Sequence, residues 1–347
     1  MRIGDREIGL EHPPYVIAEI GVNHDGEVGR ALELTDAATD AGADAVKLQY
    51  FETDRLMSRA AKLAAYQKAA GETDPIEMLR RLELTLDEMA LVVERAHERG
   101  IHAIVTVFSV ELVERAETLG WDAYKSASPD IVNKPLLDAI AGTGKPLIVS
   151  TGASTLDEVV RAAGWLEGAR DRLAMLQCVS SYPAPDMALG GIGAIANSTG
   201  LIAGYSDHTS AIETGARAVE HGARILERHI TYDTSAKGPD HGASLEPDGF
   251  ARYTQLARAA DRIEYVAGDK DVLDCERDVR EVSRQSVVAA KPIPEGTTIT
   301  RDMLTIKRPG TGILAYRIED VVGTIAQREI DGDVPIVEDD FAALERA

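Results

Sequence analysis

Apolar runs rich in valine and isoleucine alternate with amphipathic stretches from about residue 15 to about residue 268. Short apolar runs predict buried strands, and apolar residues at helical spacing predict helices packed against a core. The expected strands are Tyr15–Ile20, Ala43–Gln49, His102–Val107, Ala123–Lys125, Pro146–Ser150, Leu173–Cys178, Leu201–Tyr205 and Arg224–His229. The expected helices are Val28–Ala41, Leu86–Arg99, Val110–Thr118, Lys134–Ala141, Leu156–Glu167, Met187–Asn197, Ala211–Glu220 and Pro247–Val266.

Eight strand–helix units over roughly 250 residues predict a (β/α)8 barrel. A doubly wound open sheet would place a glycine-rich phosphate loop after the first strand. The segment Glu19–His24 contains one glycine and is not such a loop. The pattern therefore favours the closed barrel.

The pattern changes towards the C-terminus. Residues 269–283 are dense in Asp, Glu and Arg, and we expect an exposed, partly helical linker there. Short apolar runs joined by Pro and Gly turns follow, which predicts a small β-rich domain. The predicted organisation is a barrel at 1–268, a linker at 269–283 and a second domain at 284–347.

The formal net charge of −21 excludes some classes of partner. Nucleic acids and anionic membranes are bound by net positive surfaces, so we expect neither as a partner. No signal peptide is evident at the start of the sequence, no apolar run is long enough to span a bilayer, and only two cysteines are present. These features predict a cytoplasmic protein without disulfides. The acidity fits either a salt-rich cytoplasm or an ordinary acidic enzyme.

Polar or ionisable side chains stand at the C-terminal end of every predicted strand. In a barrel these ends meet at one mouth, where the chemistry of such folds is found. The side chains are Glu19, Lys47, Gln49, Thr106, Lys125, Ser126, Ser150, Thr151, Cys178, Ser180, Tyr182, Ser206, His208, Glu227 and His229. The sequence therefore predicts one functional site at this mouth.

The residue types at the mouth indicate a chemistry. His208 and His229 end consecutive strands, so their imidazoles would lie side by side and suit a divalent metal with open positions. Lysines with hydroxyls suit a phosphate and a carboxylate, and two glutamates are candidate acid–base groups. Together they indicate a small anionic phosphoester that meets a metal-activated carbonyl, and therefore carbon–carbon bond formation.

Several segments in order along the chain resemble the sialic acid synthases. They are Ile17–His24, Gly42–Gln49, Tyr124–Lys125, Ser150–Gly152, Cys178–Pro183, Ser206–Thr209, Glu227–His229, Gly238–Asp240, Ser244–Pro247 and Lys307–Gly312. The last segment lies in a module that resembles the antifreeze-like (SAF) domain of that family. The resemblance implies condensation of phosphoenolpyruvate with an N-acylated aldohexose to a nine-carbon 2-keto acid and phosphate.

The resemblance also implies roles for individual residues. His208 and His229 would hold the metal, Mn²⁺ or alternatively Mg²⁺ or Co²⁺. Glu19, Glu227, Lys47 and Lys125 would be catalytic. The substrate-binding residues would be Gln49, Thr106, Ser128, Ser150, Ser180, Tyr182, Ser206, Asp240 and Arg308. Arg308 would reach the sugar in a neighbouring subunit, which implies a domain-swapped homodimer.

One departure from the family pattern concerns the acceptor sugar. Sialic acid synthases have Thr-Asn-Ile after the cysteine, whereas this chain has Val179-Ser180-Ser181. The run Ser-Ser-Tyr-Pro is closer to synthases of pseudaminic or legionaminic acid, which use diacetamido sugars. Three alternatives remain for the function: a Schiff-base aldolase that uses Lys47 or Lys125, an inactive carbohydrate-binding protein, and a synthase that adds phosphoenolpyruvate to erythrose 4-phosphate.

Overall fold

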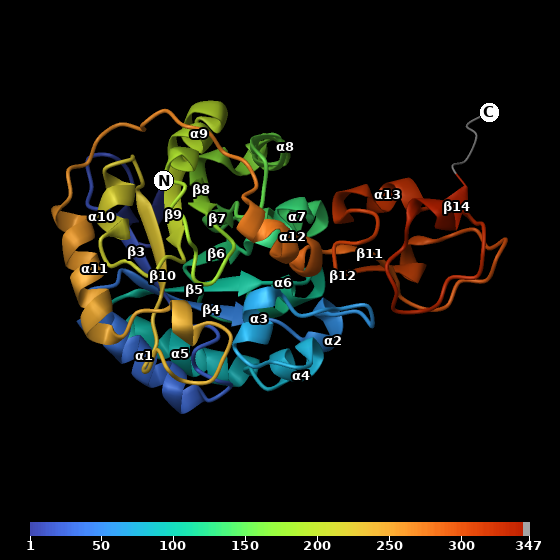
Figure 1. The fold of residues 1–347 in the computed structure, drawn as a ribbon, viewed down its shortest axis with the longest axis horizontal. Helices are drawn as coiled ribbons and strands as arrows, with labels where there is room; N and C mark the ends of the chain where they lie inside the picture. The colour runs from blue at the N-terminus through green and yellow to red at the C-terminus, as the bar shows by residue number, and fades with distance from the viewer. Residues whose placement is uncertain (343–347) are drawn as a thin grey trace.

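A closed barrel of eight parallel strands forms the larger part of the computed structural model, which describes residues 1–342 (Figure 1). The strand order around the barrel is β10-β3-β4-β5-β6-β7-β8-β9. Its strands are β3 (Tyr15–Glu19), β4 (Ala45–Tyr50), β5 (His102–Val107), β6 (Ala123–Ser126), β7 (Leu147–Ser150), β8 (Leu173–Cys178), β9 (Ile202–Asp207) and β10 (Ile225–His229). The predicted fold is confirmed, and each strand end lies within two residues of its predicted place.

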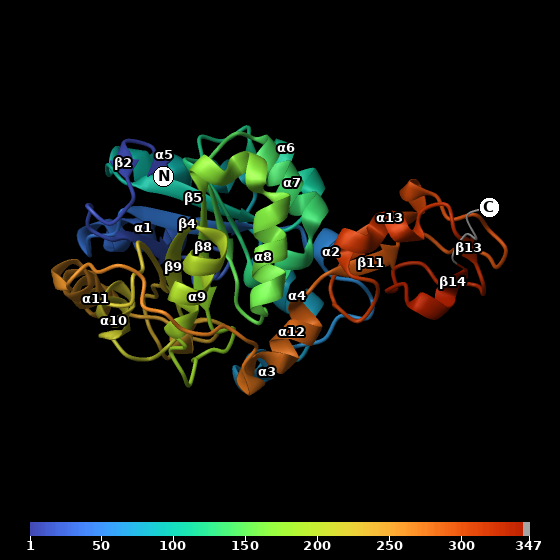
Figure 2. The same cartoon turned by 90° about the horizontal axis from the view of Figure 1, so that it is seen from above.

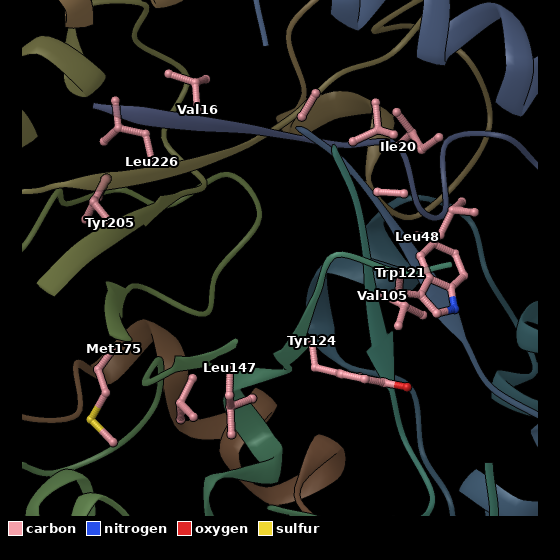
Figure 3. Packing of buried hydrophobic residues seen from close by; sticks show 14 of the residues in the cluster. Val16, Ile20, Leu48, Val105, Trp121, Tyr124, Leu147, Met175, Tyr205 and Leu226 are labelled. Atoms are coloured by element: carbon pink, nitrogen blue, oxygen red, sulfur yellow. The ribbon is translucent and has the colours of Figure 1, made fainter. Parts of the chain in front are cut away.

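Helices surround the barrel because outward-facing strand residues form an apolar layer against them. Figure 3 shows part of this layer, including Val16, Leu48, Val105, Met175 and Leu226. The covering helices are α1 (Val28–Asp40), α5 (Leu86–Glu98), α6 (Val110–Ala116), α7 (Lys134–Gly142), α8 (Leu156–Trp165), α9 (Gly190–Thr199), α10 (Thr214–Val219) and α11 (Pro247–Ala259). None of the helices within residues 1–342 is long and apolar enough to cross a membrane.

The N-terminal end of the barrel is closed by the first residues of the chain. Strands β1 (Arg2–Ile3) and β2 (Arg6–Glu7) form a small hairpin. Its Ile3 and the following Ile8 are buried against inward-facing strand residues such as Ile17 and Ile225. These apolar side chains fill the barrel interior, so open space for chemistry lies at the opposite end.

Three short helices between β4 and α5 were not predicted. They are α2 (Thr53–Leu56), α3 (Ala65–Ala69) and α4 (Pro75–Arg80). Helix α4 begins where the Asp74 carboxylate accepts hydrogen bonds from the amides of Ile76 and Glu77, with Pro75 at the first helical position. These helices enclose a small apolar cluster that contains Phe51, Leu56, Leu63, Met78, Leu79, Leu82 and Phe108. They build a wall beside the mouth of the barrel.

The linker was predicted to be exposed to solvent, but part of it is buried. Helix α12 (Arg277–Ser283) confirms its partly helical character. However, Lys270 and Glu276 are buried, as is Arg284 directly after the linker. Glu276 accepts a hydrogen bond from the Ala153 amide of the barrel, and Arg284 pairs with Glu158. Helix α11 also ends earlier than predicted, since the chain beyond Ala259 turns to bond the start of β10 through Arg224 and the carbonyl of Ile263.

The C-terminal region forms a second, β-rich domain that extends to one side of the barrel (Figure 2). Strands β11 (Ser286–Ala289) and β12 (Leu304–Lys307) pair, as do β13 (Ile325–Ala326) and β14 (Phe341–Ala342). Helix α13 (Ile318–Val321) packs on the domain's own apolar cluster, which includes Val287, Ile299 and Ile336. The predicted end of this domain, residues 343–347, lies outside the described residues.

Candidate active site

The strand register brings the predicted polar side chains to one mouth. Glu19 on β3 lies opposite His229 on one side and Lys47 on the other. Thr106 on β5 lies opposite Gln49 and Lys125 in the same way. One pocket at this mouth is lined by every residue that the sequence analysis assigned to catalysis, substrate binding or metal binding. The structure therefore confirms their proximity, whereas their roles stay predictions.

A buried charge cluster forms the floor of the pocket. The Lys47 ammonium pairs with the Glu19 carboxylate, and its Nζ lies 3.9 Å from Glu227 Oε2. The Lys125 Nζ lies 3.5 Å from Glu227 Oε1. The hydroxyls of Ser206 and Thr106 complete the cluster: Ser206 donates to Glu227 at 2.7 Å, and Lys47 donates to Thr106 at 3.1 Å. Two cations and two anions therefore neutralise one another.

The proton affinities of this cluster follow from burial and pairing. Burial alone would raise the pKa of Glu227, but Lys125 and Lys47 outweigh it and hold the pKa at about 2. Burial lowers the pKa of Lys47 to about 8, against the opposing effect of Glu227. At neutral pH Glu227 is thus a carboxylate and Lys47 mainly an ammonium. An anionic ligand that pairs with the lysines would weaken their ion pairs with the glutamates and so raise the pKa of Glu227.

Serine hydroxyls stand beside the cluster around a tightly packed glycine. The Gly152 amide donates to Ser128 Oγ at 2.9 Å. A Cβ at position 152 would lie 2.2 Å from Ser180 Oγ and 2.8 Å from Ser128 Oγ, so only glycine fits between these hydroxyls. Ser150 ends β7 two residues earlier and also lines the pocket. The arrangement offers several hydrogen-bond donors next to two lysines, which suits a phosphate or carboxylate.

The two histidines lie side by side, with ring centroids 5.6 Å apart. His208 Nδ1 lies 2.8 Å from the Val179 carbonyl oxygen, which accepts its hydrogen bond, so Nε2 is the nitrogen that the neutral ring would present to a ligand. Burial, with the charges of His208 and Lys47, lowers the pKa of His229 well below its usual value. Within the described part of the chain His229 Nδ1 has no hydrogen-bond partner, and it lies 4.0 Å from Asp240 Oδ2. His229 can therefore offer a neutral nitrogen as a ligand. Burial would also lower the pKa of His208, but Cys178 and the Val179 carbonyl outweigh it and raise that pKa, so a metal ion at His208 would have to compete with a proton.

No group of three or more His, Cys, Asp or Glu side chains within residues 1–342 is placed to hold a metal ion. The histidine pair thus offers two protein nitrogens, and an ion bound there would keep positions for other oxygen ligands.

A buried ion pair behind the histidines was not singled out from the sequence. Asp207 and Arg228, the neighbours of His208 and His229, are both fully buried with Oδ1 and Nη1 2.9 Å apart. Asp207 also accepts from the Thr209 amide and hydroxyl. The alternation of β-strand side chains sends Asp207 and Arg228 outwards while the histidines face the mouth. This pair ties β9 to β10 and fixes the spacing of the two rings.

The outer wall of the pocket comes from segments that sequence reasoning missed. Tyr66 and Gln67 of α3, Met78 and Leu79 of α4, and Leu82 line it together with Phe108 and Val279. Tyr66 packs on Tyr182, which in turn packs on His208 with ring centroids 4.1 Å apart. Within the segment from α2 to α4, Asp74 followed by Pro75 is a local sequence signal for the start of a helix, here α4. The wall is mostly apolar, unlike the floor.

Asp130 is a further carboxylate that the sequence analysis missed. It is fully buried, and neither carboxylate oxygen has a hydrogen-bond partner among residues 1–342. Burial raises its pKa to about 7, although Arg308 and Lys125 act in the opposite direction. Asp130 lies five residues after Lys125, in the helical turn that follows β6, and this position near the mouth of the barrel was a signal for a site residue. A carboxyl group that titrates near neutrality beside a pocket is a candidate functional group.

Arg308 lies in the pocket of its own chain, whereas the sequence analysis expected it to reach a neighbouring subunit. Its amide donates to the Leu56 carbonyl at 2.8 Å, and its carbonyl accepts from the Ser58 amide at 3.0 Å. Its guanidinium lies 5.5 Å from the Phe108 ring centroid. Arg308 therefore lines the pocket within the single chain, and an exchange of domains between subunits is not tested by it. The homodimer itself stays a prediction.

Comparisons with known proteins agree with this architecture. The model of the NeuB family matches residues 34–271, and that of the SAF domain matches residues 284–342. The chain is 37% identical over 319 residues to an N,N'-diacetyllegionaminic acid synthase of Legionella pneumophila, and the match covers 89% of each protein. It is 34% identical to an N-acetylneuraminate-9-phosphate synthase of Homo sapiens, over 96% of this chain and 93% of that protein.

A solved structure has the same two-domain arrangement. The crystal structure of a spore coat polysaccharide biosynthesis protein from Bacillus subtilis superposes with a TM-score of 0.85 at 26% identity. The superposition covers 99% of both chains, so it includes the barrel and the second domain. The likeness therefore extends over the whole of the molecule.

Proposed function

Because the chain belongs to the NeuB family, we propose that it condenses phosphoenolpyruvate with an N-acylated aldohexose. The products are a nine-carbon 2-keto sugar acid and inorganic phosphate. One observation carries the proposal: a single pocket joins a floor of paired lysines and glutamates to an apolar wall with one arginine. The floor suits the anionic donor, and the wall suits the acyl group of a sugar.

The donor would bind at the floor. Its phosphate and carboxylate would take hydrogen bonds from Lys47, Lys125 and the hydroxyls of Ser128, Ser150 and Ser206. As the lysines turn to the donor, the pKa of Glu227 would rise from about 2, because those lysines hold it low. Glu19 and Glu227 could then accept a proton from the water that attacks C2 of the donor. The C3–C1 bond to the sugar forms, and the C2–O bond to phosphate breaks.

The acceptor would bind between the histidines and the apolar wall. Gln49, Tyr182 and Asp240 would position the sugar, and Met78, Leu79 and Phe108 offer an apolar surface for an acyl methyl group. Arg308 would donate to the acyl oxygen. Lys47 and Lys125, which also line the pocket, each have a carboxylate within 4.0 Å, whereas Arg308 has none among residues 1–342. Its guanidinium is therefore available to a ligand.

His208 and His229 fit a divalent ion, Mn²⁺ in our proposal, with Mg²⁺ or Co²⁺ as alternatives. Two adjacent imidazoles, the lowered pKa of His229 and its Nδ1, which has no hydrogen-bond partner within residues 1–342, support that fit. The ion would polarise the aldehyde oxygen of the acceptor. The protein's own part is to hold both rings in place through the Val179 carbonyl and the Asp207–Arg228 pair.

The acceptor can be identified with one assay. Phosphate release from phosphoenolpyruvate should be measured with N-acetylmannosamine, its 6-phosphate and diacetamido hexoses, with and without a chelator. We expect acceptor-dependent phosphate release that the chelator abolishes. A Schiff-base aldolase would instead be trapped as a covalent adduct by borohydride, and a binding protein would release no phosphate with any acceptor.

A further inference from the structure

The linker contacts the active-site loops at their backbone. Glu276 is 1% exposed, and its Oε1 accepts from the amides of Ala153 at 2.6 Å and Ser180 at 2.7 Å. Its other oxygen accepts from the Leu273 amide at 3.0 Å. One carboxylate on the linker therefore joins the loop after β7 to the loop after β8.

The carbonyl of Ala153 is held from the same segment. Arg280 Nη1 donates to it at 2.6 Å, and Arg284 Nη2 donates to it at 3.2 Å. Both guanidinium groups also bind the Glu158 carboxylate at the start of α8, each with two hydrogen bonds. Both backbone polar groups of Ala153 are thus bonded to linker side chains.

Ala153 needs such support because its backbone is strained. It has a φ of 52°, in the left-handed region that costs a residue with a Cβ about 1–2 kcal/mol. The preceding Gly152 is wedged between the hydroxyls of Ser128 and Ser180. A shift of this loop would therefore move both serines relative to the pocket.

The opposite side of the linker holds the second domain. The Gly310 amide donates to the Glu281 carbonyl on α12 at 2.9 Å, and Gly310 packs against the Arg284 side chain. This turn follows Arg308 directly. Figure 2 shows α12 between the barrel and the second domain.

We propose that the segment Lys270–Arg284 is a positioning element of the active site and that Glu276 is its central positioning residue. It sets the serines at the floor of the pocket and, through α12, ties their position to that of Arg308. Lys270 is 7% exposed, and its main attractive partner is Glu276, so a buried cation balances the buried carboxylate. The kinetic part of this inference rests on the proposed function.

Two variants and one matched control test the role. Glu276→Ala removes the acceptor of both amides, whereas Glu276→Gln keeps an oxygen at nearly the same place. Glu281→Ala changes an exposed glutamate of the same region whose side chain forms no ion pair or hydrogen bond within residues 1–342. Hydrogen exchange should be followed at the amides of Ala153 and Ser180 in the substrate-free protein. The KM of phosphoenolpyruvate and kcat should be measured separately in the phosphate-release assay.

We expect both amides to exchange at least about tenfold faster in Glu276→Ala than in the control, with other barrel amides unchanged. The KM of phosphoenolpyruvate should rise about tenfold with a smaller change in kcat, and Glu276→Gln should lie closer to wild type. The inference is overturned if Glu276→Ala matches Glu281→Ala in both measurements. Faster exchange throughout the barrel with unchanged kinetic constants would equally overturn it, because that result describes general stability.

Failure of the proposed function gives a different result. A wild-type protein that releases no phosphate with any acceptor would contradict the reaction. The exchange rates at Ala153 and Ser180 would still decide whether Glu276 holds the two loops.

Discussion

The floor and the wall of the pocket are built by different rules. The floor consists of strand-end side chains whose charges are paired within the barrel, as for Lys47 with Glu19. The wall comes from α3, α4 and the second domain and is mostly apolar. It contains Arg308, which has no carboxylate within 4.0 Å among residues 1–342. A ligand at the floor must compete with existing ion pairs, whereas a ligand at the wall meets a free cation. The floor is therefore suited to a charged ligand, and under the proposed function the wall would select the acceptor.

The largest effect should come from the histidines between floor and wall. His229→Ala should lower phosphate release on the order of 10³-fold or more, because one of two imidazole ligands is lost. The exposed His12 provides the control, and His12→Ala should keep wild-type activity. Far-UV circular dichroism should show that both variants fold. Retained turnover of His229→Ala at saturating metal would contradict the assigned role.

Breaking the charge balance of the floor should cost stability. Lys47→Met should lower the free energy of unfolding by about 3–5 kcal/mol, since Glu19 loses its buried partner. Adding Glu19→Gln to this variant should restore most of that stability without restoring phosphate release. Urea unfolding measures the first effect. A single variant as stable as wild type would show that the floor charges are not balanced as described.

Asp130 near the wall gives a pH-dependent prediction. Its pKa of about 7 exceeds the value of about 4 in an unfolded chain. The folded state therefore holds a proton that the unfolded state releases, and wild-type stability falls as pH rises from about 4 to about 7. Asp130→Asn cannot titrate and lacks this pH dependence. The difference in unfolding free energy between the variant and wild type should therefore shift in favour of the variant by roughly 2–3 kcal/mol from pH 5 to pH 8. Asp138→Asn, at an exposed ion pair, should show no such gain.

Replacing Arg308 should change the KM of the acceptor and leave that of phosphoenolpyruvate nearly unchanged. Arg308→Ala should raise the KM of the acceptor about tenfold to fiftyfold, as expected for one hydrogen bond from a charged group. The KM of phosphoenolpyruvate should change much less. Arg301→Ala, on the exposed surface of the same domain, is the matched control. Equal increases in both KM values would place Arg308 at the floor rather than the wall.

The sequence predicted the floor because the barrel dictates it. Side chains alternate between the two faces of each strand, and the parallel register puts Glu19, Lys47, Lys125 and His229 at one mouth, so knowing the strands was sufficient. The wall depends on long-range contacts that no local pattern encodes. Helix α3 has five residues and weak periodicity, and its place beside Tyr182 follows from packing.

The linker shows the same limit. Its Asp, Glu and Arg content predicts a solvated segment, yet Glu276 is buried because two barrel amides and Lys270 compensate its charge. Composition cannot indicate such compensation, since the residues of the two amides lie over 90 residues away in the chain. The same applies to Arg308, whose approach to the pocket depends on how the second domain docks.

The hairpin at the base of the barrel has a kinetic consequence. With Ile3 and Ile8 sealing the far end, both substrates must use the same entrance. The floor residues Glu19, Lys47 and Lys125 are at most 4% exposed, whereas Tyr66 and Arg308 at the wall are half-buried. A sugar seated at the wall would block the way to the floor. Steady-state turnover should therefore follow a compulsory order, with the enol phosphate entering first and the sugar second.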